Sequence, residues 1–190
     1  EEQAVFARNW LAIGRADQIR EKGQFFTAEV AREPLVVVRA QGSELRAFYN
    51  VCRHHAAAVV AAEQGCADTF RCPYHGWTYG TDGALKGMVE FEDVAGFDRA
   101  KNGLISLRVE TWENFVFVNL DMHAAPLHGY LGSIRDLVTP LRWPEKLRFF
   151  ERRVYELNCN WKVYVDNYLD GGYHVPHAHK NLSSVIEYTA

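Results

Sequence analysis

Two short segments, each pairing one cysteine with one histidine, constrain this chain more than any other feature. They are Cys52-Arg53-His54 and Cys72-Pro73-Tyr74-His75. Both segments lie just after or just within predicted strands, so two loops of one sheet can bring the four side chains together. Two thiolates and two neutral imidazoles hold a [2Fe-2S] cluster, with both cysteines on one iron and both histidines on the other. We therefore predict a redox centre in these loops.

A closed zinc site is the structural alternative for the same four ligands. Zinc fingers commonly pair Cys with Cys and His with His, whereas each loop here carries one of each, which favours the cluster. The other two cysteines, Cys66 and Cys159, are expected to be ordinary small side chains, buried or partly exposed, without a role in the site. The cysteine spacing is not that of a disulfide framework, so a reducing compartment is expected.

Composition allows one large domain or two small ones, because the 190 residues are 48% hydrophobic. The net charge of -3 and the lack of a basic run argue against nucleic acid as a partner. No stretch approaches the ~20 apolar residues of a membrane span. The start, Glu1-Glu2-Gln3, has no Met and no signal-peptide pattern, so it is interpreted as trimmed or internal. We expect a cytoplasmic protein.

The region up to Leu120 is predicted to be mainly β, in an antiparallel barrel or sandwich. Residues 1–13 form a short amphipathic segment in this prediction. Turn signals at 41–43 and 81–83 separate runs rich in β-branched and aromatic residues. These predicted strands are 25–27, 34–38, 45–49 and 114–120.

A second architecture is expected to begin near Leu147. Residues 126–144 form a connector with a helical pattern in 131–141. Residues 149–157 alternate as a strand does, and 161–173 are predicted to be a helix that ends before Pro176.

A second histidine pair, His174 and His179, follows that helix. A mononuclear Fe(II) oxygenase uses two histidines and one carboxylate, with open positions for O2 and substrate. The alternative is a polar helix end with surface histidines. Residues five apart do not share a helix face, so Pro176 is expected to break the helix between the two.

The first two segments resemble the Rieske family, on Asn50–His54 and Arg71–Trp77, and the resemblance covers most of residues 30–120. High-potential Rieske proteins carry an additional cysteine in each ligand loop, and these two cysteines are linked to each other. This chain has no additional cysteine in either loop, which favours the oxygenase and ferredoxin branch of the Rieske family. The family spacing assigns His54 as the ligand. His55, where related oxygenases commonly carry Arg, is expected beside the ligands or at the surface.

The stretch 160–179 resembles the start of the catalytic domain of Rieske non-haem iron oxygenase α-subunits. The resemblance implies that His174 and His179 bind Fe(II) and that His177 does not. The family's third ligand is an Asp far downstream, so it is absent from this chain, which is expected to be truncated at Ala190.

A family Asp three residues before the first ligand histidine links the iron to a neighbouring subunit's cluster. Gly171 stands at that position here, and the catalytic candidates for the relay are Asp166 and Asp170.

Four segments are expected: an N-terminal segment packing on the catalytic part (1–28), a Rieske [2Fe-2S] domain (29–125), a connector (126–146) and the start of an α+β catalytic domain (147–190). The motif around Asp170 looks most like the choline monooxygenase and quaternary-amine oxygenase branch.

The resemblance implies that a ferredoxin or flavin reductase donates electrons, which travel through the cluster to iron, where O2 oxygenates a small organic substrate. It also implies a homo-oligomer, expected to be a trimer. Monooxygenation of a choline-like amine is favoured over aromatic dihydroxylation. A stand-alone Rieske ferredoxin is the alternative from another class.

Overall fold

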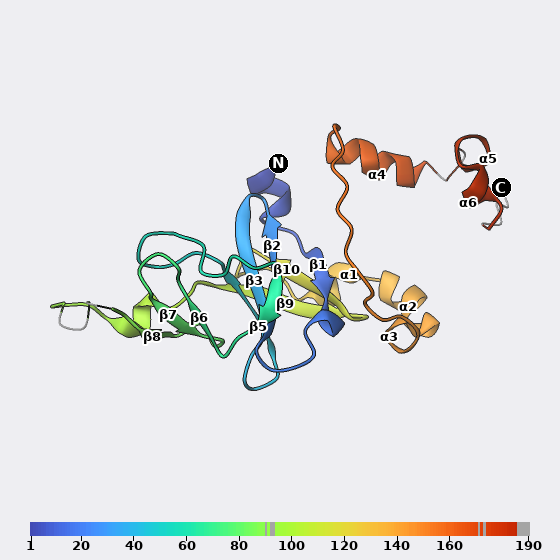
Figure 1. Ribbon diagram of the computed structural model, residues 1–190. Coiled ribbons are helices and arrows are strands. Elements are labelled where there is room, and N and C mark those ends of the chain that lie inside the picture. The colour runs from blue at the N-terminus through green and yellow to red at the C-terminus, as the bar shows by residue number, and fades with distance from the viewer. Residues whose placement is uncertain (90, 92–93, 171, 173, 186–190) are drawn as a thin grey trace. The chain divides into compact units, whose positions relative to one another are not determined.

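The computed structural model describes residues 1–89, 91, 94–170, 172 and 174–185 (Figure 1). The chain divides into two compact units, Glu1–Phe150 and Glu151–Ala190. The first unit is built on two antiparallel sheets and carries both Cys/His loops. The second consists of an extended segment followed by helices.

The larger sheet of the first unit has seven strands, and the smaller one has three (Figure 1). The order in the larger sheet is β1 (Leu11–Arg15), β10 (Phe115–Asn119), β9 (Ser106–Trp112), β4 (Leu45–Tyr49), β3 (Glu33–Arg39), β2 (Gln24–Val30) and β5 (Gln64–Cys66). The order in the smaller sheet is β6 (Thr69–Arg71), β7 (Thr78–Gly80) and β8 (Leu85–Gly87). The mainly β, antiparallel fold predicted from the sequence is confirmed.

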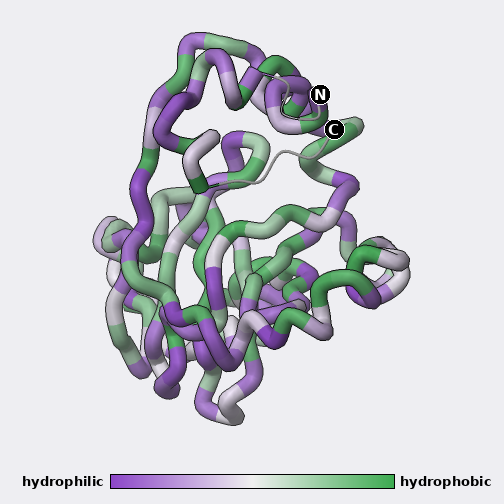
Figure 2. Tube along the Cα trace, turned by 90° about the vertical axis from the view of Figure 1, so that its right-hand side faces the viewer, coloured by the Kyte–Doolittle hydropathy of each residue, from purple (hydrophilic) through white to green (hydrophobic). Residues whose placement is uncertain are grey.

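Strand β3 is buried on both faces, which explains why its sequence is a continuous apolar run. Residues 35–38 are all 0% exposed, and successive side chains point to opposite faces of a strand. Val36 and Val38 belong to one hydrophobic core, whereas Leu35 and Val37 belong to the other. Burying each such side chain stabilises the fold by roughly 1.5–3 kcal/mol. Figure 2 shows hydrophobic and hydrophilic stretches interspersed along the chain.

The first core joins the two sheets and includes both predicted cysteine ligands. Cys52 and Cys72 lie in it with Phe25 and Phe48 of the larger sheet and Tyr79 of the smaller one. The second core, on the other face of the larger sheet, contains no cysteine among its described members. The packing of the two sheets thus places the two thiols inside the protein.

The turn at Thr81-Asp82-Gly83 brings the smaller sheet against β4. Gly83 has φ +83°, and a Cβ there would lie 2.4 Å from Cε1 of Phe48. Only glycine tolerates both the left-handed backbone and this close approach. The turn predicted here is therefore also a contact between the two sheets.

The N-terminal part differs from the expected amphipathic segment. Glu2–Phe6 is a π-helical turn, after which the chain enters β1. Residues 11–15 and 24–28 therefore belong to strands of the larger sheet, and they follow its antiparallel register with β10 and β3. The domain boundaries given above stay predictions.

Short helical turns lie in the connector and in two loops of the first unit. The α-helices are α1 (Leu127–Leu131), α2 (Ile134–Val138) and α3 (Trp143–Lys146). The 3-10 turns of the first unit are η2 (Ala16–Gln18), η3 (Arg99–Asn102) and η4 (Thr139–Leu141).

The prediction of a strand at 149–157, across the end of the first unit and the start of the second, is wrong. The segment has no regular structure, and residues 150–157 are exposed. Alternating apolar residues form a strand only when a neighbour satisfies the backbone groups, and none of the described strands pairs with this segment.

The helix expected at 161–173 is α4, Trp161–Leu169, and the Asn160 side chain caps it by accepting the Lys162 N–H at 3.0 Å. Pro176 does not end this helix. It lies in the first turn of α5 (Val175–Ala178), where its missing N–H costs nothing. A further turn, α6, spans Lys180–Ser183. Within the described part of the chain, no helix has the length and apolarity to cross a membrane.

Candidate functional site

The two Cys/His loops close in the same way. In the first, the Cys52 N–H donates to the Ala57 carbonyl at 2.8 Å, and the Ala56 N–H donates to the Cys52 carbonyl at 3.0 Å. In the second, the Cys72 N–H donates to the Trp77 carbonyl at 2.8 Å, and the Gly76 N–H donates to the Cys72 carbonyl at 3.0 Å. Each cysteine thus begins a turn of matching geometry that carries a histidine.

Burial separates the two predicted ligand cysteines from the other two. Cys52 and Cys72 are each 3% exposed, whereas Cys66 and Cys159 are exposed. All four thiols are free. A pair of buried free thiols, one from each of two matching turns, fits a metal centre that needs two thiolates.

The histidines of the two loops meet. The ring centroids of His54 and His75 lie 4.8 Å apart, and the ring of His54 stacks on Trp77 at 4.8 Å with an interplanar angle of 3°. The Nδ1 atom of His54 is buried and makes no hydrogen bond. An unsatisfied buried nitrogen is costly unless it has a partner, and a coordinated metal provides one. The residues therefore fit the predicted cluster.

His55 lies in the same group. Ligand atoms of His54, His55 and His75 all lie within 4.8 Å of one another, with His55 and His75 exposed. Burial, together with the neighbouring His55 and His75 rings, lowers the pKa of His54. A lowered pKa favours the neutral imidazole that a metal requires. His55 is thus adjacent to the predicted ligands, as expected.

Sequence reasoning missed Tyr79, which lies against the site. Its hydroxyl is 3.3 Å from the Cys52 Sγ and accepts the Arg53 N–H at 3.0 Å. The ring is 0% exposed, and burial and the Cys52 contact raise the pKa of Tyr79. If Cys52 held a metal as its thiolate, the neutral Tyr79 hydroxyl would donate a hydrogen bond to the sulfur. Hydrogen bonds to cluster sulfurs are one of the features that set reduction potential.

Asn50 is a second residue whose role was missed. Its buried side-chain oxygen accepts the N–H groups of Val59 at 3.1 Å and Val60 at 2.8 Å, and its amide nitrogen donates to the Val60 carbonyl at 2.7 Å. These bonds tie together the two ends of the loop that carries Cys52 and His54. An Asn two residues before the predicted ligand Cys52 was the available signal in the sequence.

One backbone difference between the matching turns gives a stability prediction. Gly76 has φ +74°, and the equivalent Ala56 has φ +57°, a conformation that costs a non-glycine residue about 1–2 kcal/mol. Ala56→Gly should therefore raise the free energy of unfolding by up to about 1 kcal/mol, since glycine's larger unfolded-state entropy offsets part of the gain. The reciprocal Gly76→Ala should lower it by about 1–2 kcal/mol. Urea denaturation of both variants checks the pair, and equal effects of the same sign would contradict it.

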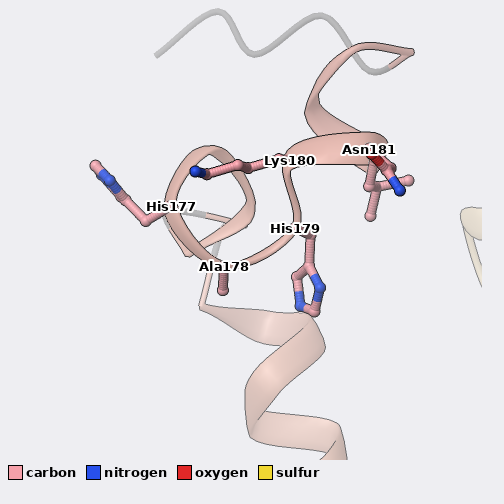
Figure 3. Close-up of a pocket in the computed structure, with 6 residues that line it drawn as sticks. His177, Ala178, His179, Lys180 and Asn181 are labelled. Carbon is pink, nitrogen blue, oxygen red and sulfur yellow. The ribbon is translucent and has the colours of Figure 1, made fainter.

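The second predicted site lies in the second unit. The ring centroids of His174 and His179 are 5.3 Å apart, at 77° to each other. Figure 3 shows the side chains of His177 and His179 pointing in different directions from the turn that carries them, at a hollow lined by residues 177–182. The structure thus brings together the two histidines that were assigned to iron.

Asp170 contacts one member of this pair, His174. Its Oδ2 lies 2.8 Å from the Nδ1 of His174, while its Oδ1 accepts the Gly172 N–H at 2.7 Å. The Gly172 hydrogen bond, followed by that of His174, lowers the pKa of Asp170. A carboxylate on Nδ1 fixes the tautomer and leaves Nε2 free for a metal. These residues fit a mononuclear iron, with the third protein ligand still to be supplied.

Asp166, the other relay candidate, is exposed one turn earlier on α4, where its carbonyl accepts the Asp170 N–H at 3.0 Å. Gly171 and Tyr173 lie outside the described residues. The structure therefore places Asp170, rather than Asp166, in contact with a predicted iron ligand.

Comparison with known proteins identifies both parts of the chain. The Rieske [2Fe-2S] domain matches residues 9–98, and the catalytic domain of the ring hydroxylating alpha subunit matches residues 144–189. Between them these two models cover most of the chain. The first implies a [2Fe-2S] cluster, and the family of the second uses a mononuclear iron.

Individual relatives agree with these matches. Chloroplastic choline monooxygenase from Arabidopsis thaliana is 37% identical over 96% of this chain and 46% of its own length. The carnitine monooxygenase oxygenase subunit of Escherichia coli is 33% identical over 98% of this chain and 50% of its own length. The crystal structure of the quaternary ammonium Rieske monooxygenase CntA in complex with L-carnitine superposes with a TM-score of 0.89 at 32% identity, over 98% of this chain and 53% of that one.

The chain spans about half the length of the curated relatives it matches. Along the chain, the match to the Rieske domain precedes the match to the catalytic domain. The chain belongs to the family of Rieske non-haem iron oxygenase α-subunits.

Proposed function

We infer that the protein to which this chain belongs is a Rieske oxygenase that inserts oxygen from O2 into a small organic substrate. In this proposal Cys52, His54, Cys72 and His75 hold the [2Fe-2S] cluster. His174 and His179 are two of the ligands of Fe(II). The observation that carries the proposal is the approach of the His174 and His179 rings to 5.3 Å, on a chain that also carries the two matching Cys/His turns.

The first unit would serve as the electron relay. A bound [2Fe-2S] cluster supplies one-electron redox capacity, and a bound Fe(II) supplies the activation of O2. The chain's own contribution would be to bury the two thiols, to favour the neutral form of His54 and to stack the buried Trp77 on its ring. The exposed edge of His75 leaves one ligand accessible to an electron donor or acceptor.

In the second unit, Asp170 would act as the residue that positions His174. The family's relay Asp stands one residue later, where this chain has Gly171. The 2.8 Å contact with the His174 Nδ1 supports Asp170 as its replacement. From this position the carboxylate orients the imidazole and holds the proton on Nδ1.

Replacing Asp170 with alanine should therefore weaken iron binding at the second site. Loss of such a supporting hydrogen bond typically costs 10–100-fold in metal affinity. We expect an effect of about that size in the complete polypeptide expressed from its gene, measured by competition with an iron chelator. Asp166→Ala is the matched control, because it removes a carboxylate one turn earlier in the chain, on α4. Equal losses of iron affinity in Asp170→Ala and Asp166→Ala would contradict the proposal that Asp170 positions His174.

The substrate would be a quaternary amine, by monooxygenation. The support is that the similar proteins are named as choline and carnitine monooxygenases and as a quaternary ammonium monooxygenase. O2 consumption by the complete polypeptide with choline, L-carnitine or naphthalene tests this. Uptake stimulated by either amine, with a hydroxylated product, is expected. Uptake only with naphthalene would favour the alternative, aromatic dihydroxylation.

A ferredoxin or flavin reductase is the proposed electron donor, and a trimer is the proposed assembly. A stand-alone ferredoxin-like carrier is the alternative from another class. Sedimentation of the complete polypeptide tests the trimer, and reduction by NADH only in the presence of an added reductase tests the donor. The cytoplasmic location stays a prediction.

A further inference from the structure

Two phenylalanines pack beside the histidine of the first ligand loop. The Phe91 ring meets the His54 ring edge to face, with centroids 6.0 Å apart, and meets the Trp77 ring in the same way at 5.4 Å. The Phe97 centroid lies 4.9 Å from that of Phe91 and 5.8 Å from that of Trp77. Edge-to-face contacts at such separations are a favoured arrangement of aromatic rings. We call Phe91 and Phe97 together the aromatic cover.

The aromatic cover belongs to the predicted ligand site rather than to a sheet. Both phenylalanines are partly buried and pack against the core that contains Cys52 and Cys72. They lie between β8 and η3, where the described residues form neither strand nor helix. The Arg99 Nε donates to the Leu85 carbonyl at 2.9 Å, which ties the end of this stretch back to β8. The chain thus leaves the smaller sheet, adds two aromatic rings to the site and returns to the same sheet.

The aromatic cover makes the two predicted histidine ligands unequal in their access to solvent. His54 contacts both the buried Trp77 and the Phe91 ring, and its Nδ1 atom is buried. His75, in contrast, is exposed. The aromatic ring beside it, Tyr74, is itself 64% exposed. The described residues therefore shield the His54 side of the site and leave the His75 side open to water.

Shielding one side of the cluster has an electrostatic consequence. In the oxidised cluster two ferric ions are balanced by two sulfides and two thiolates, so the added electron gives the reduced cluster a net negative charge. Apolar surroundings disfavour a charge, and solvent exposure is one of the properties that set the potential of an iron–sulfur cluster. We propose that the aromatic cover keeps water from the His54 side of the cluster and thereby lowers its reduction potential. This inference rests on the proposed function, because it requires the cluster to be bound by His54.

The first test is the midpoint potential of the cluster in the complete, cluster-loaded polypeptide, measured by EPR during a redox titration. Phe91→Ser replaces the ring with a small polar side chain, whereas Phe91→Leu keeps an apolar one. Phe150→Ser is the matched control, since Phe150 belongs to the same unit but is 88% exposed. We expect a higher potential in Phe91→Ser, a smaller rise in Phe91→Leu and no change in Phe150→Ser. An unchanged or lower potential in Phe91→Ser would overturn the proposal. Phe97→Ser, for which a higher potential is also expected, takes the place of Phe91→Ser should that variant fail to fold.

The second test measures the access of water directly. Pulsed EPR of the reduced polypeptide in D2O detects deuterons that have exchanged close to the cluster. We expect a stronger deuterium signal in Phe91→Ser than in wild type, and an unchanged signal in Phe150→Ser. A higher potential in Phe91→Ser without a stronger deuterium signal would overturn the shielding role. A wild-type polypeptide that binds no cluster would overturn the proposed function together with this inference, whereas a loaded cluster that does not respond to Phe91→Ser would overturn this inference alone.

Discussion

Cys72→Ser is expected to abolish the visible absorption of this chain and the EPR signal of its reduced form. A serine oxygen replaces one of two thiolates that the cluster needs on the same iron. Because Cys72 is 3% exposed in the core that joins the two sheets, the loss should also lower the stability of the first unit. Absorption spectra, iron analysis and thermal unfolding of the purified chain measure both effects.

Cys66→Ser is the matched control for this experiment. Cys66 is an exposed thiol of the same unit, at the end of β5, and its Sγ makes a single weak contact of 3.7 Å to the Lys22 carbonyl. Its replacement should leave absorption, EPR signal and iron content unchanged. A Cys72→Ser protein that kept its colour, or a Cys66→Ser protein that lost it, would refute the assignment of the cysteine ligands.

His174→Ala in the complete polypeptide is expected to remove the mononuclear iron and with it all O2-dependent turnover, while the cluster stays intact. His174 is the one proposed iron ligand whose Nδ1 contacts a described carboxylate, that of Asp170. Its loss therefore removes an iron ligand together with the hydrogen bond that orients it. The expected iron content falls by about one atom per chain, with unchanged cluster absorption.

His177→Ala provides the comparison, because His177 lies between the two proposed ligands in the sequence and its side chain points in a different direction from that of His179 (Figure 3). It should keep both the iron and the turnover. Retention of the mononuclear iron in His174→Ala, or its loss in His177→Ala, would show that the pattern of histidines was misassigned.

Features that depend on local residue types were predictable from the sequence. Strand β4 has the predicted bounds, 45–49, and the predicted runs 25–27 and 34–38 lie within β2 and β3. The four cluster residues stood out because metal ligands must be of particular types at short spacings. The histidine pair at 174 and 179 stood out for the same reason, and the structure brings its rings together.

Features that depend on contacts far apart in the sequence were not predictable in this way. Tyr79 looks like an ordinary strand residue until its hydroxyl is placed against Cys52. Likewise, nothing local places Phe91 against the ring of His54. The prediction of a strand at 149–157 failed because the alternation of apolar and polar residues does not tell whether a partner strand is present.

Pro176 shows a different limit. Proline disfavours helix in the residue before it, which predicted the end of a helix, yet the same fixed φ suits the first turn of a new one. The chain had already left α4 at Leu169, so Pro176 lies in the first turn of α5 instead. A proline in the sequence therefore marks a helix boundary, but it does not tell whether a helix ends before it or begins there.

The most direct test of the central claim, that one polypeptide carries a Rieske cluster and a mononuclear iron, is metal and acid-labile sulfide analysis of the complete polypeptide, purified without air. The account predicts a coloured protein with about three irons and two sulfides per chain, of which a chelator removes one iron without loss of the cluster absorption. A colourless protein with about one zinc and no sulfide would contradict it, because the same four ligands would then form a structural zinc site.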